Sequence, residues 1–141
     1  MQNILVATDD SEGGERAVDV AAEIAKGLVG NLSSITVGDN LSREETRQLS
    51  ATEKTSGRRW ISFAKQILRR GMKRAAIRRV HGQDAHRLGY PAEAIIDVVP
   101  RDSIEMLVVG RRGRGQFAGL LLGSVSQKLV TLGPCIVIVV P

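Results

Sequence analysis

Residues 110–126, G-R-R-G-R-G-Q-F-A-G-L-L-L-G-S-V-S, combine glycines, arginines and serines in a pattern suited to holding an anion. The apolar run before them, residues 106–109, is typical of a buried strand, so the glycines fall in the loop that follows it. Glycine lets backbone N–H groups approach an anion that a Cβ atom would exclude. Ser124 precedes a helical pattern at residues 125–132 as a candidate N-cap, and the N-terminus of such a helix attracts negative charge. The local pattern therefore predicts a phosphate site.

Three arginines in this loop add mobile cations to the predicted phosphate site: Arg111, Arg112 and Arg114. The loop is not a Walker A motif, because no Lys-Ser or Lys-Thr pair follows a glycine at the required spacing. Its G-x-G-x-x-x-G spacing is one residue too long for a dinucleotide fingerprint, and the loop follows a late strand. A glycine-rich turn without a ligand is the alternative interpretation.

A second polar turn, Thr8-Asp9-Asp10-Ser11, follows the apolar run at residues 3–8. Two roles are open to Asp9. It can cap the helix that follows, or its carboxylate can accept hydrogen bonds from an adenine amino group or a ribose hydroxyl. Spacing alone leaves both roles open.

Five apolar runs predict strands at residues 3–8, 32–37, 75–80, 106–109 and 136–140. Helical patterns lie between them, at residues 17–28, 60–71, 92–99 and 125–132. A loop is expected at residues 81–89, and Pro100 is expected to end the third helix. This alternation predicts a single α/β domain over residues 1–141, an open five-stranded parallel sheet with helices on both faces. If the first and fourth strands are neighbours, Asp9 and the glycine loop flank one crevice at the carboxyl ends of the strands.

The chain has 141 residues, of which 43% are hydrophobic, and these values fit one globular domain. No apolar run reaches membrane-spanning length and the first residues enter a strand pattern at once, which predicts a cytoplasmic protein without a membrane segment. The single cysteine, Cys135, lies beside an apolar run and is expected to be a buried, unreactive thiol. The spacing of His81, Asp84 and His86 matches no common structural zinc pattern, so no metal site is predicted there.

The net charge of +5 is concentrated in the middle of the chain. Residues 57–90 carry 10 basic and 1 acidic side chains, whereas residues 1–56 carry 5 basic and 10 acidic ones. Such a basic stretch suits either a nucleic-acid patch or a solvated helix face. Aromatic residues for base stacking make up only 3% of the chain, which favours the solvated face over nucleic-acid binding.

Three stretches of the chain resemble the universal stress protein family. I-L-V-A-T-D-D-S-E at residues 4–12 is similar to the family's first strand and aspartate, and G-Y-P-A-E-A-I at residues 89–95 to its third-helix entry. Residues 110–124 match its nucleotide-binding signature, Gly-x2-Gly-x9-Gly-Ser, completely. The resemblance implies a Rossmann-like sheet of the adenine nucleotide alpha hydrolase type, in which the first and fourth strands are neighbours. It also implies ATP or AMP binding, often with Mg²⁺ or Mn²⁺, and homodimers that pair their last strands, Ile136–Val140.

By position, the resemblance implies that Asp9 holds adenine together with backbone groups of Ala7, Thr8 and Val37. Val109 and Gly110 would line the ribose side. The residues expected around the phosphates are Arg112, Gly113, Gly123, Ser124, Val125 and Ser126.

Three features depart from the family's pattern. Asp10 stands where a glycine is usual, Thr36 stands where a histidine is common, and residues 81–88 look longer than the usual connection. Asp10 adds negative charge near the nucleotide, which can weaken binding. None of these departures touches the glycine loop.

The predicted function is a nucleotide-binding regulator of a stress response rather than an efficient enzyme. No histidine or carboxylate close to the glycine loop in sequence presents itself as a general base, so no catalytic residue is predicted and slow ATP hydrolysis is the upper limit. The alternative is a dimeric partner-binding module without bound nucleotide, which would use the basic residues 57–90 and the sheet edge.

Overall fold

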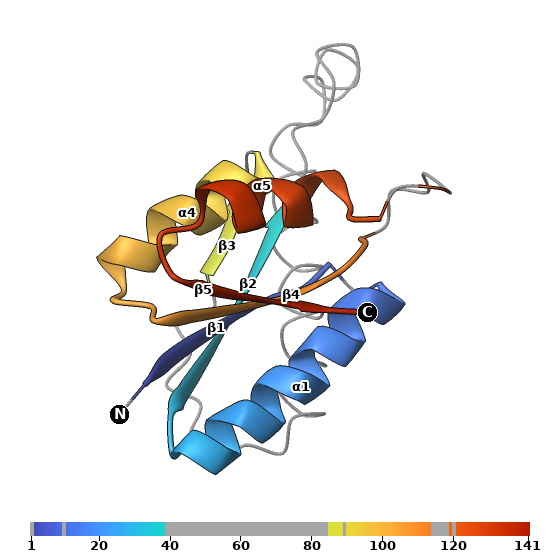
Figure 1. The fold of residues 1–141 in the computed structure, drawn as a ribbon. Helices are drawn as coiled ribbons and strands as arrows, with labels where there is room; N and C mark the ends of the chain where they lie inside the picture. The colour runs from blue at the N-terminus through green and yellow to red at the C-terminus, as the bar shows by residue number, and fades with distance from the viewer. Residues whose placement is uncertain (1, 10, 39–84, 89, 114–118, 120) are drawn as a thin grey trace, which may run out of the picture.

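The strands form a parallel sheet in the order β3-β2-β1-β4-β5, shown in Figure 1. The computed structural model describes residues 2–9, 11–38, 85–88, 90–113, 119 and 121–141. The elements are β1 (Asn3–Ala7), α1 (Glu12–Leu28), β2 (Asn31–Gly38), β3 (Ala85–Leu88), α4 (Pro91–Arg101), β4 (Met106–Gly110), α5 (Ser124–Leu132) and β5 (Ile136–Val140). The prediction of a parallel α/β fold is confirmed.

β1 lies between β2 and β4, as the prediction of neighbouring first and fourth strands required. Ala7 is level with Ile35 of β2 on one side and with Val109 of β4 on the other. The three strands therefore end at one edge of the sheet. The chain winds from β1 towards β2 but from β4 towards β5, in the opposite direction. Such a reversal of winding is where open α/β sheets bind ligands.

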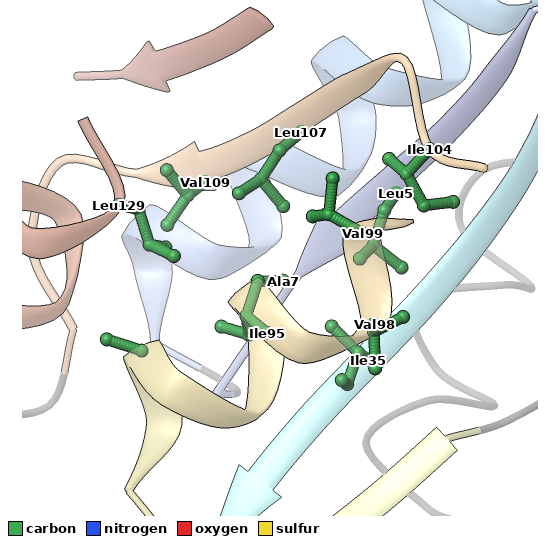
Figure 2. Packing of buried hydrophobic residues seen from close by; sticks show 11 residues of the cluster. Leu5, Ala7, Ile35, Ile95, Val98, Val99, Ile104, Leu107, Val109 and Leu129 are labelled. Carbon is green, nitrogen blue, oxygen red and sulfur yellow. The ribbon is translucent and has the colours of Figure 1, made fainter. Parts of the chain in front are cut away.

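Two hydrophobic clusters cover the opposite faces of the sheet. On one face α1 packs a stripe of small apolar residues against the strands: Ala17, Val18, Ala21, Ala22 and Ala25. On the other face α4 and α5 pack around Leu5, Ile35 and Leu107 (Figure 2). Strand side chains alternate between the two faces, and burial on both sides explains why the central strands β1 and β4 are mostly apolar.

α1 begins and ends at signals that are visible in the sequence. Ser11 is its N-cap, with a side-chain oxygen that accepts a hydrogen bond from the Gly14 N–H at 3.0 Å. After Leu28 the chain turns at Val29, which has a left-handed φ of 51°, and the Gly30 N–H donates to the Ala25 carbonyl. The predicted helix end near residues 27–30 is confirmed.

α4 continues past Pro100 to Arg101, so the prediction that this proline ends the helix was wrong. Pro100 has no N–H to donate, but N–H groups of residues after it donate to carbonyls of the last turn. The Asp102 N–H donates to Val98 and the Ile104 N–H to Val99, at 2.9 and 2.8 Å. Val98 and Val99 are buried against the sheet, and this packing holds the last turn in place.

β3 lies within residues 81–89, where a loop was predicted, and this is a second correction. It pairs in parallel with β2, with Ala85 level with Ile35. An edge strand has a neighbour on one side only, so it forms from a more polar sequence than a central strand does. The predictions for residues 39–84, including the strand at 75–80, most of the basic stretch, and His81 and Asp84, lie outside the described residues. Within the described ranges, no helix has the length and apolar character to cross a membrane.

Candidate functional site

The turn after β1 holds Asp9 at the carboxyl edge of the sheet. Thr8 is buried, and its backbone N–H donates to the Ile35 carbonyl at 3.1 Å, which fixes the turn to β2. Asp9 Oδ1 accepts hydrogen bonds from the Ser11 N–H, at 3.1 Å, and from the Ser11 hydroxyl. Asp9 thus orients the N-cap residue of α1, which leaves its second oxygen on the side of the glycine loop.

Gly113 in the glycine loop meets Asp9 directly. A Cβ atom on Gly113 would collide with Asp9 Oδ2 and would lie 3.5 Å from Asp9 Cγ. A side chain at position 113 would therefore require the Asp9 carboxylate to move from its present place. The pairing of β1 with β4 therefore brings the acidic turn and the glycine loop together, as the strand order predicted.

Backbone hydrogen bonds close the base of the glycine loop. The Gly123 N–H donates to the Arg111 carbonyl at 2.9 Å, and the Arg111 N–H donates to the Val140 carbonyl at the end of β5 at 2.6 Å. A Cβ atom on Gly123 would lie 3.8 Å from the Gly113 nitrogen. The two glycines of the Gly-x9-Gly spacing therefore lie side by side, and Asp9 lies next to them.

The N-terminus of α5 begins at this same point. Gly123 is the N-cap, with φ of −68° and ψ of 160°, and its carbonyl accepts the Gln127 N–H at 2.9 Å. Ser124 is the first helical residue and is exposed, so the N-cap lies one position earlier than predicted. Among the described residues, no side chain caps this end. The first N–H groups of a helix lack intrahelical acceptors and favour an anion.

Ser126 is buried, with 2% of its surface exposed, unlike the exposed Ser124. Its hydroxyl donates to the carbonyl of Gly110, the last residue of β4, at 2.7 Å. Among the predicted phosphate-binding residues, Ser126 therefore already uses its side chain inside the protein. Its backbone N–H belongs to the first turn of α5.

Two glycines at the start of α1, Gly13 and Gly14, contribute to the site and were missed from the sequence. A Cβ atom on Gly13 would lie 2.6 Å from the Arg112 carbonyl oxygen, and one on Gly14 would lie 2.7 Å from Thr8 Oγ1. A Cβ atom on Gly110 would lie 2.7 Å from the carbonyl carbon and oxygen of Gly13. Glycine in a helix costs about 1 kcal/mol relative to alanine, so a Gly-Gly pair there signals a close backbone approach.

The other predicted site residues line the same edge through their backbones. Ala7 and Val109 are buried, Val37 is partly buried, and all three side chains belong to the cluster under α4 and α5. Arg112 is exposed and directly precedes Gly113. A ligand at this edge would therefore meet backbone groups from three strands and a cation from the loop.

Cys135 lies apart from these residues, just before β5, and is partly buried against the core. Burial raises the pKa of its thiol, so the neutral thiol persists to higher pH than in an exposed cysteine. The side chain is thus partly buried rather than fully buried as expected, and the raised pKa favours an unreactive thiol. In the part of the chain that the structure describes, no three His, Cys, Asp or Glu side chains gather as a metal site.

Among the described residues, the site offers the carboxylate of Asp9 and several backbone N–H donors. The carboxylate of Asp9 can accept hydrogen bonds from an amino or hydroxyl group, whereas the N-terminus of α5 can donate to anionic oxygens. This arrangement suits a ligand with a polar base or sugar at one end and a phosphate at the other.

Known proteins resemble this chain in sequence and in fold. A model of the universal stress protein family matches residues 1–141. The universal stress protein YxiE of Bacillus subtilis is 28% identical over an alignment of 150 positions, which covers 97% of this chain and 97% of that protein. A universal stress protein solved in complex with cAMP is 28% identical, with a TM-score of 0.72, over 99% of this chain and 97% of that one. The hypothetical protein MJ0577 has a TM-score of 0.84 at 22% identity, over 99% and 94% of the two chains. The present chain belongs to the universal stress protein family.

Proposed function

We propose that this protein binds an adenine nucleotide, ATP or AMP, at the edge of the sheet between β1 and β4. One observation carries the proposal: the Asp9 carboxylate lies against Gly113, which lies beside Gly123 at the N-terminus of α5. An acceptor for the base and donors for the phosphates are thus adjacent. The cAMP complex of a relative supports the adenine nucleotide class.

Asp9 would accept a hydrogen bond from the adenine amino group, with Ala7, Thr8 and Val37 supplying backbone groups. The β1–β2 pairing supports this, because Thr8 is bonded to β2 and brings the end of that strand beside Asp9. Val109 and Gly110 would contact the ribose from the end of β4.

The phosphates would lie at the N-terminus of α5. Gly113, Ser124 and Val125 would supply backbone N–H donors, together with the Ser124 hydroxyl and the Ser126 N–H. The Gly123 N–H is bonded to the Arg111 carbonyl, so Gly123 would contribute as the N-cap without a side chain in the way of the phosphates. Arg112 would add a positive charge from the rim. A Mg²⁺ or Mn²⁺ ion that arrives with ATP would be held chiefly by phosphate oxygens and water, as hard cations are at nucleotide sites.

We further propose that the protein is a stress-response regulator in the cytoplasm. It would signal by binding the nucleotide rather than by hydrolysing it. Asp9 is already engaged with Ser11 and with the α1 N-terminus, which suits retention of a nucleotide better than activation of water. Slow ATP hydrolysis is compatible with this role.

A second copy of the chain is the proposed partner of β5. This strand lies at an edge of the sheet, and Ile136 at its start is 61% exposed. Val130 and Leu132 on α5 are 50% and 61% exposed. An apolar edge strand is an aggregation liability unless another strand pairs with it. Antiparallel or parallel pairing of two β5 strands would remove the liability and produce a homodimer.

Two measurements test nucleotide binding. Mass spectrometry of the denatured, purified protein is expected to detect a co-purified adenine nucleotide. Titration calorimetry on nucleotide-free protein is expected to show saturable ATP and AMP binding and weaker GTP binding. A protein that carries no nucleotide and gives no binding heat with ATP or AMP would instead support the partner-binding alternative.

A further inference from the structure

We propose that Ser126 is a positioning residue, which holds the N-terminus of α5 against the end of β4 and does not contact the phosphate through its hydroxyl. This inference rests on the proposed nucleotide binding and assigns one residue of that site a different role from its neighbours. Ser126 would act on the ligand through the placement of the Gly123 and Ser124 backbone.

The Ser126 hydroxyl joins the two ends of the glycine loop, the end of β4 and the start of α5. It donates to the Gly110 carbonyl at 2.7 Å, and one residue further the Arg111 carbonyl accepts the Gly123 N–H at 2.9 Å. Two successive carbonyls at the end of β4, those of Gly110 and Arg111, thus accept hydrogen bonds from the start of α5. Because both partners of the first bond are buried, water does not compete for it.

Gly110 is itself fixed from the other side. Its Cα faces the backbone of Gly13 so closely that a Cβ atom would lie 2.7 Å from the Gly13 oxygen. Gly110 therefore contacts the start of both helices, α1 through Gly13 and α5 through Ser126. The start of α1 also holds Asp9, through the hydrogen bond from Ser11. The Ser126 bond sets how far the phosphate donors lie from Asp9.

A second hydroxyl on the same helix shows the ordinary behaviour. Thr131 Oγ1 donates to the Gln127 carbonyl four residues earlier at 2.9 Å, on the exposed face of α5. Serine and threonine inside helices commonly bond in this way. Ser126 instead bonds to another element, sixteen positions away in the chain. If its hydroxyl turned to a phosphate, the Gly110 carbonyl would be left buried without this donor.

The test compares ATP and adenosine affinities by titration calorimetry in four proteins: wild type, Ser126→Ala, Ser126→Thr and Thr131→Ala. We expect Ser126→Ala to weaken ATP binding on the order of tenfold and adenosine binding less than twofold, because only the phosphate donors move. Ser126→Thr keeps the hydroxyl and is expected to recover most of the ATP affinity. Thr131→Ala, which loses a hydroxyl hydrogen bond away from β4, is expected to bind both ligands as wild type does.

Amide hydrogen exchange on the nucleotide-free proteins separates positioning from direct contact. We expect faster exchange of the Gly123 N–H in Ser126→Ala than in wild type or Thr131→Ala, since the neighbouring bond to Arg111 loses its support. Unchanged exchange at Gly123, unchanged ATP affinity, or equal losses for ATP and adenosine would each overturn the positioning role alone. A wild-type protein that binds no ATP would reject the proposed function, and the positioning role with it.

Discussion

Asp9 Oδ2 occupies the space that a Cβ atom on Gly113 would need. The two residues belong to turns after different strands, and the pairing of β1 with β4 brings them into contact. Asp9 on the base side of the proposed site therefore contacts Gly113 on the phosphate side. A change on either side is expected to affect the other.

Replacement of Gly113 by alanine is expected to lower ATP affinity at least about tenfold, because the new methyl group displaces the Asp9 carboxylate and narrows the phosphate approach. Circular dichroism is expected to stay close to wild type, since Gly113 is exposed. Gly27→Ala is the matched control: a Cβ atom there would meet nothing within 4 Å, and its ATP affinity should be unchanged. Equal ATP affinities for Gly113→Ala and wild type would contradict the proposed cradle.

Replacement of Asp9 by alanine is expected to cost about 1.5 to 3 kcal/mol of ATP binding free energy, through the loss of a charged acceptor. In the Asp9→Ala background, Gly113→Ala should cost less than in wild type, because the carboxylate that it would displace is gone. Titration calorimetry on the two single variants and the double variant measures this coupling. Strict additivity would show that the contact has no influence on binding, and equal GTP and ATP affinities in wild type would show that Asp9 does not read the base.

Replacement of Gly110 by alanine is expected to lower the free energy of unfolding by about 1 to 3 kcal/mol, as overpacking in a tight interior does. The added Cβ atom would press on the backbone of Gly13, which cannot rotate away as a side chain could. Urea unfolding measures the effect. A Gly110→Ala protein as stable as wild type would show that α1 can shift away from β4 at little cost.

Replacement of Ser11 by alanine is expected to lower the free energy of unfolding by about 1 kcal/mol, because α1 loses its N-cap hydrogen bond to the Gly14 N–H. It also removes the hydroxyl donor to Asp9 Oδ1. Thermal unfolding measures the effect. Ser11→Thr retains both hydrogen bonds, and its unfolding midpoint should stay close to that of wild type. Identical midpoints for Ser11→Ala and Ser11→Thr would argue against a capping role.

Replacement of Ile136 by aspartate is expected to convert a homodimer to a monomer, because it places a charge on the apolar edge strand that the partner strand would cover. Sedimentation velocity at micromolar concentration measures the change. Leu28→Asp is the control, since Leu28 is also exposed but lies at the end of α1 and not on β5. A wild-type protein that sediments as a monomer would remove the proposed dimer.

The sequence predicted the elements whose signals are local. β4 and β5 follow from short apolar runs, and α1 follows from a small-residue stripe that begins after the N-cap Ser11. Local signals failed where a neighbour decides the structure. β3 forms because β2 offers it backbone partners, and α4 passes Pro100 because Val98 and Val99 are packed against the sheet.

For the candidate site, the sequence alone determined the chemistry: a carboxylate after one apolar strand and a glycine loop before a helix. Which groups touch was decided only by the tertiary structure. The contact of Asp9 with Gly113, the approach of Gly13 to Gly110 and the Ser126 bond to Gly110 all join elements far apart in the chain. Residue types carry hydrogen-bonding capacity and size, which are local properties, whereas a close approach depends on strand order and helix packing, which are properties of the whole fold.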